Sequence, residues 1–182
     1  MKIHHTLTVL IALLCSTISY GQTEKGSIFV GGDSFLGMGF SSDYNSFSIS
    51  PGAHYFIINN LSLGLSIPYS FSHSETETSE FTSNSIGLAP SIRYYFGETA
   101  LKPYIGVEYG FYSYSNKVKT DLVNDKYNEN QSNLTPGAGL AYFFNDKFAV
   151  NFELGYHFYK PFDGNSDNNA LRGRGGFIIK LK

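Results

Sequence analysis

Six charged residues are the best candidates for chemistry in this chain, because they fall in stretches that alternate bulky and small side chains. They are Asp33, Arg93, Glu108, Glu153, Arg172 and Arg174. We expect these opposite charges to pair, because an unpaired buried charge is costly. The same groups could instead line a narrow polar pathway for small solutes. Glu108 and Glu153 could also work as paired carboxylates in acid–base chemistry.

Two other stretches carry suitable residue types. His73, Ser74 and Glu75 could supply a nucleophile and its base, but neighbours on a strand point to opposite sides, so His73 and Ser74 cannot share a pocket without a bend. Asp163–Asn169 holds oxygen ligands for Ca²⁺ but lacks the spacing of an EF-hand loop. Phosphate-loop and zinc spacings do not occur in the sequence. We predict no catalytic residue, no metal and no cofactor.

The N-terminus reads as a cleavable signal peptide over residues 1–21. Lys2 precedes the short apolar run Leu7–Cys15, and small residues at Ser19 and Gly21 suit cleavage before Gln22. The apolar run is too short to span a membrane, which takes about 20 residues. Cys15, the only cysteine, would leave with this segment. The mature domain, residues 22–182, then has neither a disulfide nor a thiolate metal site.

Composition argues against nucleic acid as a partner and sets this chain apart from ordinary soluble domains. The chain has 13 Lys+Arg against 15 Asp+Glu, and this near balance gives no basis for nucleic-acid binding. It also has 14 Tyr, 16 Phe and 19 Gly, and only 15% of its residues are charged. About a quarter is usual for soluble domains, so this chain is poor in charge and rich in aromatic residues and glycine.

Eight stretches alternate between apolar and small or polar residues, the period of a β-strand, and a sustained helical period is absent after Gln22. The stretches are Gly26–Phe40, Phe47–Ile57, Leu61–Ser72, Ser85–Phe96, Pro103–Ser115, Leu134–Phe144, Phe148–Tyr159 and Ala170–Lys182. Prolines at 51, 68, 90 and 136 fall inside them, and each removes a ladder donor. Bulges at these prolines would shift the alternation.

The connections alternate in length. Longer loops are expected at 73–82, 116–131 and 160–169, and short turns at 58–60, 97–102 and 145–147. Transmembrane barrels of the outer-membrane type show this alternation, with long loops outside, short turns in the periplasm and an even number of strands. The pattern predicts an all-β protein, an eight-stranded antiparallel up-and-down transmembrane β-barrel with both mature termini in the periplasm.

A soluble lipocalin-like barrel would show the same alternation, and the width of the barrel decides between the two. Eight strands enclose an interior that side chains only just fill, so the bulky face cannot all point inward. Turned outward, it forms an apolar band about 25 Å tall with aromatic residues at its two edges. These aromatic residues are Tyr55, Tyr94, Phe96, Tyr142, Phe144 and Phe148 at one edge, and Phe71, Phe111, Tyr156 and Phe158 at the other. Glycine, serine and the six charges would then fill the middle. Registry estimated from the turns brings Arg93 close to Glu108, and Asp33 opposite Arg174 across the closing seam.

Lys102–Gly110, Pro136–Phe144 and Phe148–Phe158 resemble the small outer-membrane β-barrel domain family of Gram-negative bacteria. The C-terminus resembles the signal that such barrels present to the barrel-assembly machinery, with Phe177, Ile179 and Leu181 in register, but it ends in Lys182 instead of an aromatic residue. The resemblance implies a monomer in outer-membrane lipid. We expect a plugged polar lumen and a structural or surface-contact role through the long loops. The alternatives are a narrow small-solute channel and a lipid-modifying enzyme at the rim.

Overall fold

The structure is a computed structural model that describes residues 21–32, 37–40, 43–120, 122–161 and 169–182. These residues form eleven antiparallel strands. The strands are β1 (Ile28–Gly32), β2 (Gly37–Phe40), β3 (Tyr44–Ile49), β4 (Pro51–Ile58), β5 (Leu61–Ser66), β6 (Tyr69–Thr76), β7 (Ser79–Tyr95), β8 (Leu101–Thr120), β9 (Asn124–Phe143), β10 (Phe148–Pro161) and β11 (Ala170–Lys180). Within these ranges there is no helix with the length and apolar character needed to cross a membrane. Residues 1–20 of the expected signal peptide lie outside the described part.

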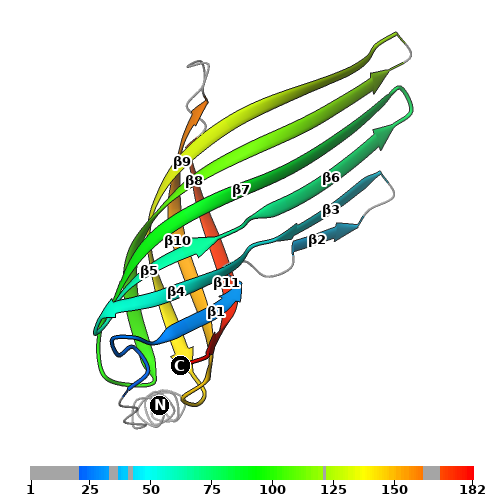
Figure 1. Cartoon of the computed structure of the whole chain (residues 1–182). Coiled ribbons are helices and arrows are strands. Elements are labelled where there is room, and N and C mark those ends of the chain that lie inside the picture. Colours follow the sequence, from blue (N-terminus) through cyan, green and yellow to red (C-terminus); the bar gives the residue numbers. More distant parts are fainter. Residues whose placement is uncertain (1–20, 33–36, 41–42, 121, 162–168) are drawn as a thin grey trace, which may run out of the picture.

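The strands form a ring of eight, which confirms the predicted fold class. β3 and β4 are separated only by Ser50 and make one wall strand, and β5 and β6, separated by 67–68, make the next. β1 and β2 pair with successive parts of the β3–β4 wall strand and count as one. The ring closes where β11 pairs with β1, from Phe29 opposite Lys180 to Gly32 opposite Phe177. Figure 1 shows the strands standing side by side around the barrel.

The prolines act on the strands in two ways. Pro51 and Pro68 lie at the breaks that divide two wall strands, as expected for residues without a ladder donor. Pro90 and Pro136 stay inside β7 and β9, and the strand register is the same on both sides of them. The irregularity in register lies between Phe56 and Ile58 instead, next to the turn in which Asn60 has a φ of 67°. The alternation therefore survives the prolines.

The connections at the two ends of the barrel differ in length. One end, here the turn end, has the short turns at Asn59–Asn60, 96–100 and 144–147. The opposite, hairpin end differs from the sequence expectation. β6 runs to Thr76 before β7 begins at Ser79, and β8 reaches Thr120 before β9 begins at Asn124. Most of the expected loops 73–82 and 116–131 is therefore strand, because the β6–β7 ladder continues to Thr76 opposite Ser79 and the β8–β9 ladder to Lys119 opposite Asn124. In Figure 1, β6 to β9 sweep away from the barrel at this end.

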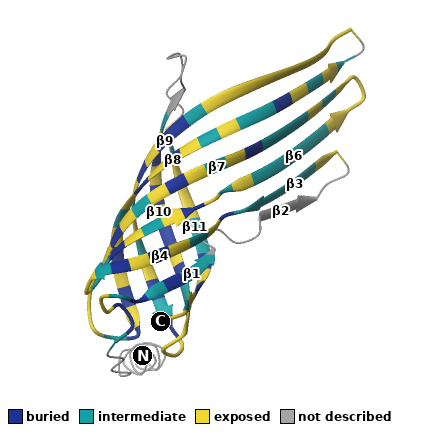
Figure 2. Ribbon diagram, viewed as in Figure 1, coloured by how far each residue is buried: buried dark blue, intermediate teal, exposed yellow. Residues whose placement is uncertain are grey.

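Bulky side chains point outward. Leu63, Val107 and Phe152 are 47%, 36% and 53% exposed, and Figure 2 shows exposed and buried residues alternating along the strands. Aromatic rings contact each other at both edges of this apolar face. Toward the turn end Tyr142 contacts Phe144 at a centroid distance of 5.1 Å, and toward the hairpin end Tyr156 contacts Phe158 at 4.8 Å. The outside therefore suits hydrocarbon, with aromatic residues at the levels where lipid headgroups lie.

The lumen at the turn end is filled by aromatic rings, which was not expected. The five rings come from β1, β4, β7, β8 and β9 and belong to Phe29, Phe56, Tyr95, Tyr104 and Phe143. Centroid distances of 4.7 Å for Phe29–Phe56, 5.7 Å for Phe29–Phe143 and 5.1 Å for Tyr95–Tyr104 describe a packed cluster. The expectation that glycine, serine and the charged residues fill the middle did not include this cluster of rings. We call this group the aromatic plug.

Candidate functional site

Next to the aromatic plug, four of the six predicted charges meet in the lumen. Arg93 on β7 donates to Glu153 on β10, with Nη2 and Oε2 2.9 Å apart. Arg174 on β11 donates to Glu108 on β8, with Nη1 and Oε1 2.7 Å apart, and its Nη2 donates to Glu153. Glu153 therefore accepts from two arginines. We call Arg93, Glu108, Glu153 and Arg174 the charge network.

Strand alternation and glycine make room for these large groups. All four residues lie on the inward parity of their strands, so each side chain points into the lumen. Gly106 sits opposite Arg93 in the β7–β8 ladder, and a Cβ there would come within 2.9 Å of the Arg93 Cγ. A Cβ on Gly139 would likewise meet the Tyr104 Cζ at 2.4 Å. Arg93 and Tyr104 thus occupy the space that glycine leaves free on the inner wall.

The pairing differs from the registry estimated from the turns. Glu108 lies opposite Ser91 on the adjacent strand, and Arg93 reaches across the lumen to Glu153. The estimate considered neighbours along the wall, whereas a long guanidinium side chain in a narrow barrel can span its interior. Asp33, expected opposite Arg174, lies outside the described residues. Arg172 faces inward too, but it lies nearer the hairpin end, with its guanidinium 5.5 Å from the Tyr159 ring centroid.

Further contacts hold the charge network in place. The Arg93 Nη1 lies 3.2 Å from the His54 Nε2, and the guanidinium stands 5.1 Å from the centroid of the Tyr104 ring. Two acids and two arginines balance in charge, which offsets the cost of taking them out of water. The Tyr104 contact joins the network to the aromatic plug.

A polar layer follows on the hairpin side of the network. The His157 Nδ1 lies 3.2 Å from the Thr135 Oγ1 and 3.4 Å from the Asn133 Nδ2. The sequence pattern put Thr135 on the inward face but did not single out Asn133 or Tyr104 as site residues. Their parity relative to the flanking apolar residues was the signal that could have identified them.

The arrangement offers little for catalysis. Glu108 and Glu153 both accept from Arg174, so neither carboxylate is set apart as a general acid. His73 hydrogen-bonds Thr82 on the next strand, at 3.0 Å from Nδ1 to Oγ1. Among the described residues no group of three or more His, Cys, Asp or Glu could hold a metal ion. Most of the Asp163–Asn169 stretch lies outside them.

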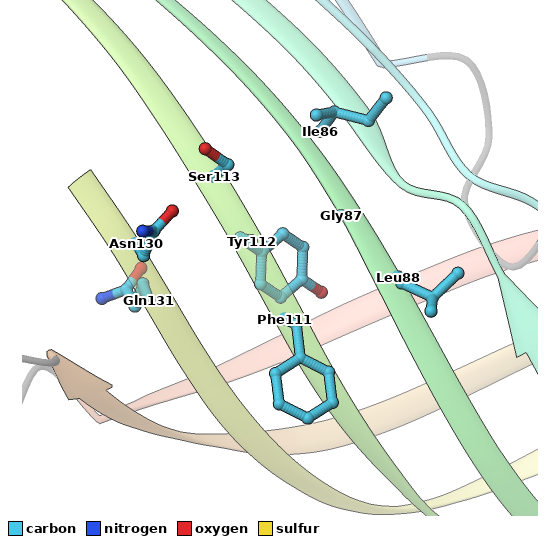
Figure 3. Close-up of a pocket in the computed structure, with 8 residues that line it drawn as sticks. All are labelled: Ile86, Gly87, Leu88, Phe111, Tyr112, Ser113, Asn130 and Gln131. Carbon is cyan, nitrogen blue, oxygen red and sulfur yellow. The ribbon is translucent and has the colours of Figure 1, made fainter. Parts of the chain in front are cut away.

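A hollow of about 380 Å³ lies on the wall between β7, β8 and β9 (Figure 3). Ile86, Leu88 and Phe111 line one part of it, and Ser113 and Asn130 line another. Apolar residues therefore give way to polar ones along the strands at this level.

These features define the class. A closed ring of eight antiparallel strands, apolar outside and charged within, is an integral transmembrane β-barrel of the outer membrane of Gram-negative bacteria. The chain belongs to the outer membrane protein beta-barrel domain family, whose model matches residues 7–175. No curated protein matches the sequence.

Two solved structures show the same fold. The N-terminal β-barrel domain of Pseudomonas aeruginosa OprF is 18% identical, with a TM-score of 0.52 over 86% of this chain and 98% of that domain. Neisserial surface protein A is 19% identical, with a TM-score of 0.50 over 85% of this chain and 94% of that protein. At these identities the similarity establishes the fold and leaves the role of this chain open.

Proposed function

We propose that this protein is a barrel closed to solutes, with a structural and surface-contact role through its hairpin end. In this proposal the turn end and both mature termini face the periplasm, and the hairpins face the outside of the cell. The alternation of short turns and long hairpins supports that orientation, because outer-membrane barrels share it.

One observation carries the closure. The aromatic plug and the charge network are stacked along the lumen and joined through Arg93 and Tyr104. Tyr95, Tyr104 and Arg93 are between 1% and 3% exposed, so water reaches almost none of their surface. A solute would have to displace packed rings and then break buried ion pairs. A narrow channel requires a continuous path instead, and an enzyme requires a reactive group with an accessible substrate site.

The hairpins supply a surface for contact. Beyond Ser113 the outward face of β8 carries Lys117 and Lys119, and Lys119 lies 3.5 Å from Glu80 on β7. β9 pairs with β8 from Asn124 onward, but within the described residues its pairing with β10 begins only at Gln131. Residues 124–130 thus extend the β8–β9 hairpin beyond the described end of β10, and this extension is the surface that we propose for contact.

Planar-bilayer recordings of the purified protein test the closure. We expect no conductance from the wild type or from Arg93→Ala, because the aromatic plug remains in the single variant. Arg93→Ala combined with Tyr104→Ala removes one member of each layer and should conduct. Glu80→Ala, on the outer surface of the hairpins, is the matched control. Steady conductance by the wild type would support the channel instead, and altered lipids in a deletion strain would support the enzyme.

A further inference from the structure

A second cavity, of about 400 Å³, lies at the hairpin end of the lumen and is separate from the charge network. Inward residues of β8, β9, β10 and β11 line it, with Asn169 beside them. The side chains used below are Tyr114, Glu129, Gln131, Tyr159 and Arg172. A cavity of this size lies within the range of small-molecule sites.

Arg172 is held in place in this cavity but is not neutralised by the described residues. Its guanidinium stands 5.5 Å from the Tyr159 ring centroid, and Tyr159 stacks on His157 at 5.7 Å with an interplanar angle of 17°. Arg93 and Arg174 each have a carboxylate partner, whereas no ion pair of Arg172 occurs within the described ranges. Among the described residues, Arg172 thus lies outside the charge network, positioned by the Tyr159 ring in a cavity that Glu129 also lines.

The cavity groups define a class of ligand. A guanidinium binds a carboxylate through two parallel N–H donors. The Tyr114 and Tyr159 hydroxyls, the Gln131 amide and the Glu129 carboxylate add donors and acceptors, which suits a ligand rich in hydroxyl groups. The Tyr114 ring adds a flat apolar surface on which the C–H face of a sugar ring can pack.

We propose that this cavity binds a sugar that carries a carboxylate, with Arg172 on the carboxylate and Tyr114 against the ring. The charge network and the aromatic plug close the lumen below, so the ligand binds at the mouth and does not pass through. This proposal goes beyond the closed barrel proposed above and depends on it only for access from outside the cell.

Saturation-transfer NMR on the full-length mature protein in detergent micelles tests the site, with glucuronate as the probe. Glucose carries the ring alone and acetate the carboxylate alone. We expect saturable glucuronate binding, with glucose and acetate at least about tenfold weaker because each lacks one set of contacts. Arg172→Ala should weaken glucuronate binding by about tenfold or more, and Arg172→Lys by less, since lysine keeps the charge and loses the fork. Tyr44→Ala, an exposed tyrosine on β3, should change nothing.

Three results would overturn the site: no saturable glucuronate binding, the same affinity in Arg172→Ala, or acetate as strong as glucuronate, which means a simple anion site. Heat-modifiable migration on unboiled gels shows that each variant is folded. Tyr159→Phe, which keeps the ring, is the second variant if Arg172→Ala does not fold, and it should retain most of the binding. Complete loss of glucuronate binding in Tyr159→Phe would make that one hydroxyl essential and would overturn the assignment of Arg172 as the main contact. If the barrel does not conduct and does not bind glucuronate, only this site is refuted. If it conducts and binds glucuronate, only the proposed closure is refuted.

Discussion

Arg93 on β7 and Glu153 on β10 form an ion pair across the lumen, at 2.9 Å, between strands that do not pair with each other. The wall of a barrel is held by neighbours, strand to strand. This contact joins opposite sides, and Arg174 adds a second arginine to the same carboxylate. The charge network therefore couples parts of the ring that the backbone ladder leaves independent.

Glu153→Gln should destabilise the protein by about 3–5 kcal/mol, because it removes the carboxylate that both the buried Arg93 and the partly buried Arg174 donate to. Urea-dependent unfolding in lipid vesicles measures the change. Glu80→Gln is the matched control, since Glu80 pairs with the exposed Lys119 and such pairs contribute about 1 kcal/mol or less. Equal effects of the two substitutions would contradict the network.

Replacing both members of the cross-lumen pair should cost less than the two single changes predict. In Arg93→Met with Glu153→Leu, the pair Arg174–Glu108 remains and no unpaired charge is added. A double-mutant cycle on unfolding free energy gives the coupling, which we expect to exceed about 1 kcal/mol, as for residues in direct contact. Strict additivity would show that Arg93 and Glu153 do not interact.

Gly64→Ala should destabilise the barrel by about 1–3 kcal/mol, the usual cost of overpacking. Its Cβ would lie 2.4 Å from the His54 ring atoms and 2.5 Å from the Ser91 Oγ, all side-chain atoms. Combining it with His54→Ala should recover part of the loss, because the clashing ring is gone. Gly173→Ala is the control, as its Cβ would make only ordinary contacts of 3.5–3.7 Å with Phe152 and Leu154.

Most of the barrel could be predicted from the sequence because its outer face carries the signal. Lipid requires an apolar residue at every second position, so Leu63, Val107 and Phe152 mark the strands and their faces. Beyond Phe111 on β8 the outward residues no longer need to be apolar, and the alternation of apolar and small residues ends there. The extension of β8 to Thr120 was missed for that reason. Val118 and Tyr127 are strand formers in that region, but no apolar residue follows at every second position around them.

The lumen was only half predictable. Parity identifies which residues face inward, so Arg93, Glu108, Glu153 and Arg174 could be named. Which of them touch depends on the direction in which each long side chain crosses the narrow lumen. The ladder register alone does not contain that information. Parity also turns Phe29, Tyr95 and Phe143 inward, but it does not show that these rings meet at one level, so the aromatic plug was missed.

Cysteine labelling tests the proposed orientation. Cys15, in the predicted signal peptide, is the only cysteine, so a cysteine introduced into the mature domain should be its sole thiol. A membrane-impermeant maleimide applied to intact cells should label Asn124→Cys at the β8–β9 hairpin and leave Lys147→Cys at the turn end unlabelled. Permeabilised cells should label both. Labelling of Lys147→Cys alone in intact cells would invert the orientation.

Leu154→Arg should hinder insertion by about 2–4 kcal/mol if its position is near the middle of the bilayer. Leu154 is exposed and lies on β10 between the aromatic residues Phe148 and Phe158. Ser113→Arg, beyond the apolar band, is the control and should insert as the wild type does. Folding into vesicles, followed by heat-modifiable migration, gives the comparison.

The most direct test of the account is a spin-label scan along β10 from Phe148 to Phe158 in lipid vesicles. Accessibility to dissolved oxygen should be high at Phe152, Leu154 and Tyr156 and low at Asn151 and Glu153, with a period of two residues. A polar nickel reagent should reach none of these positions well. Oxygen maxima at Asn151 and Glu153 would mean that the bulky face lines the interior, and would contradict both the bilayer assignment and the closed lumen.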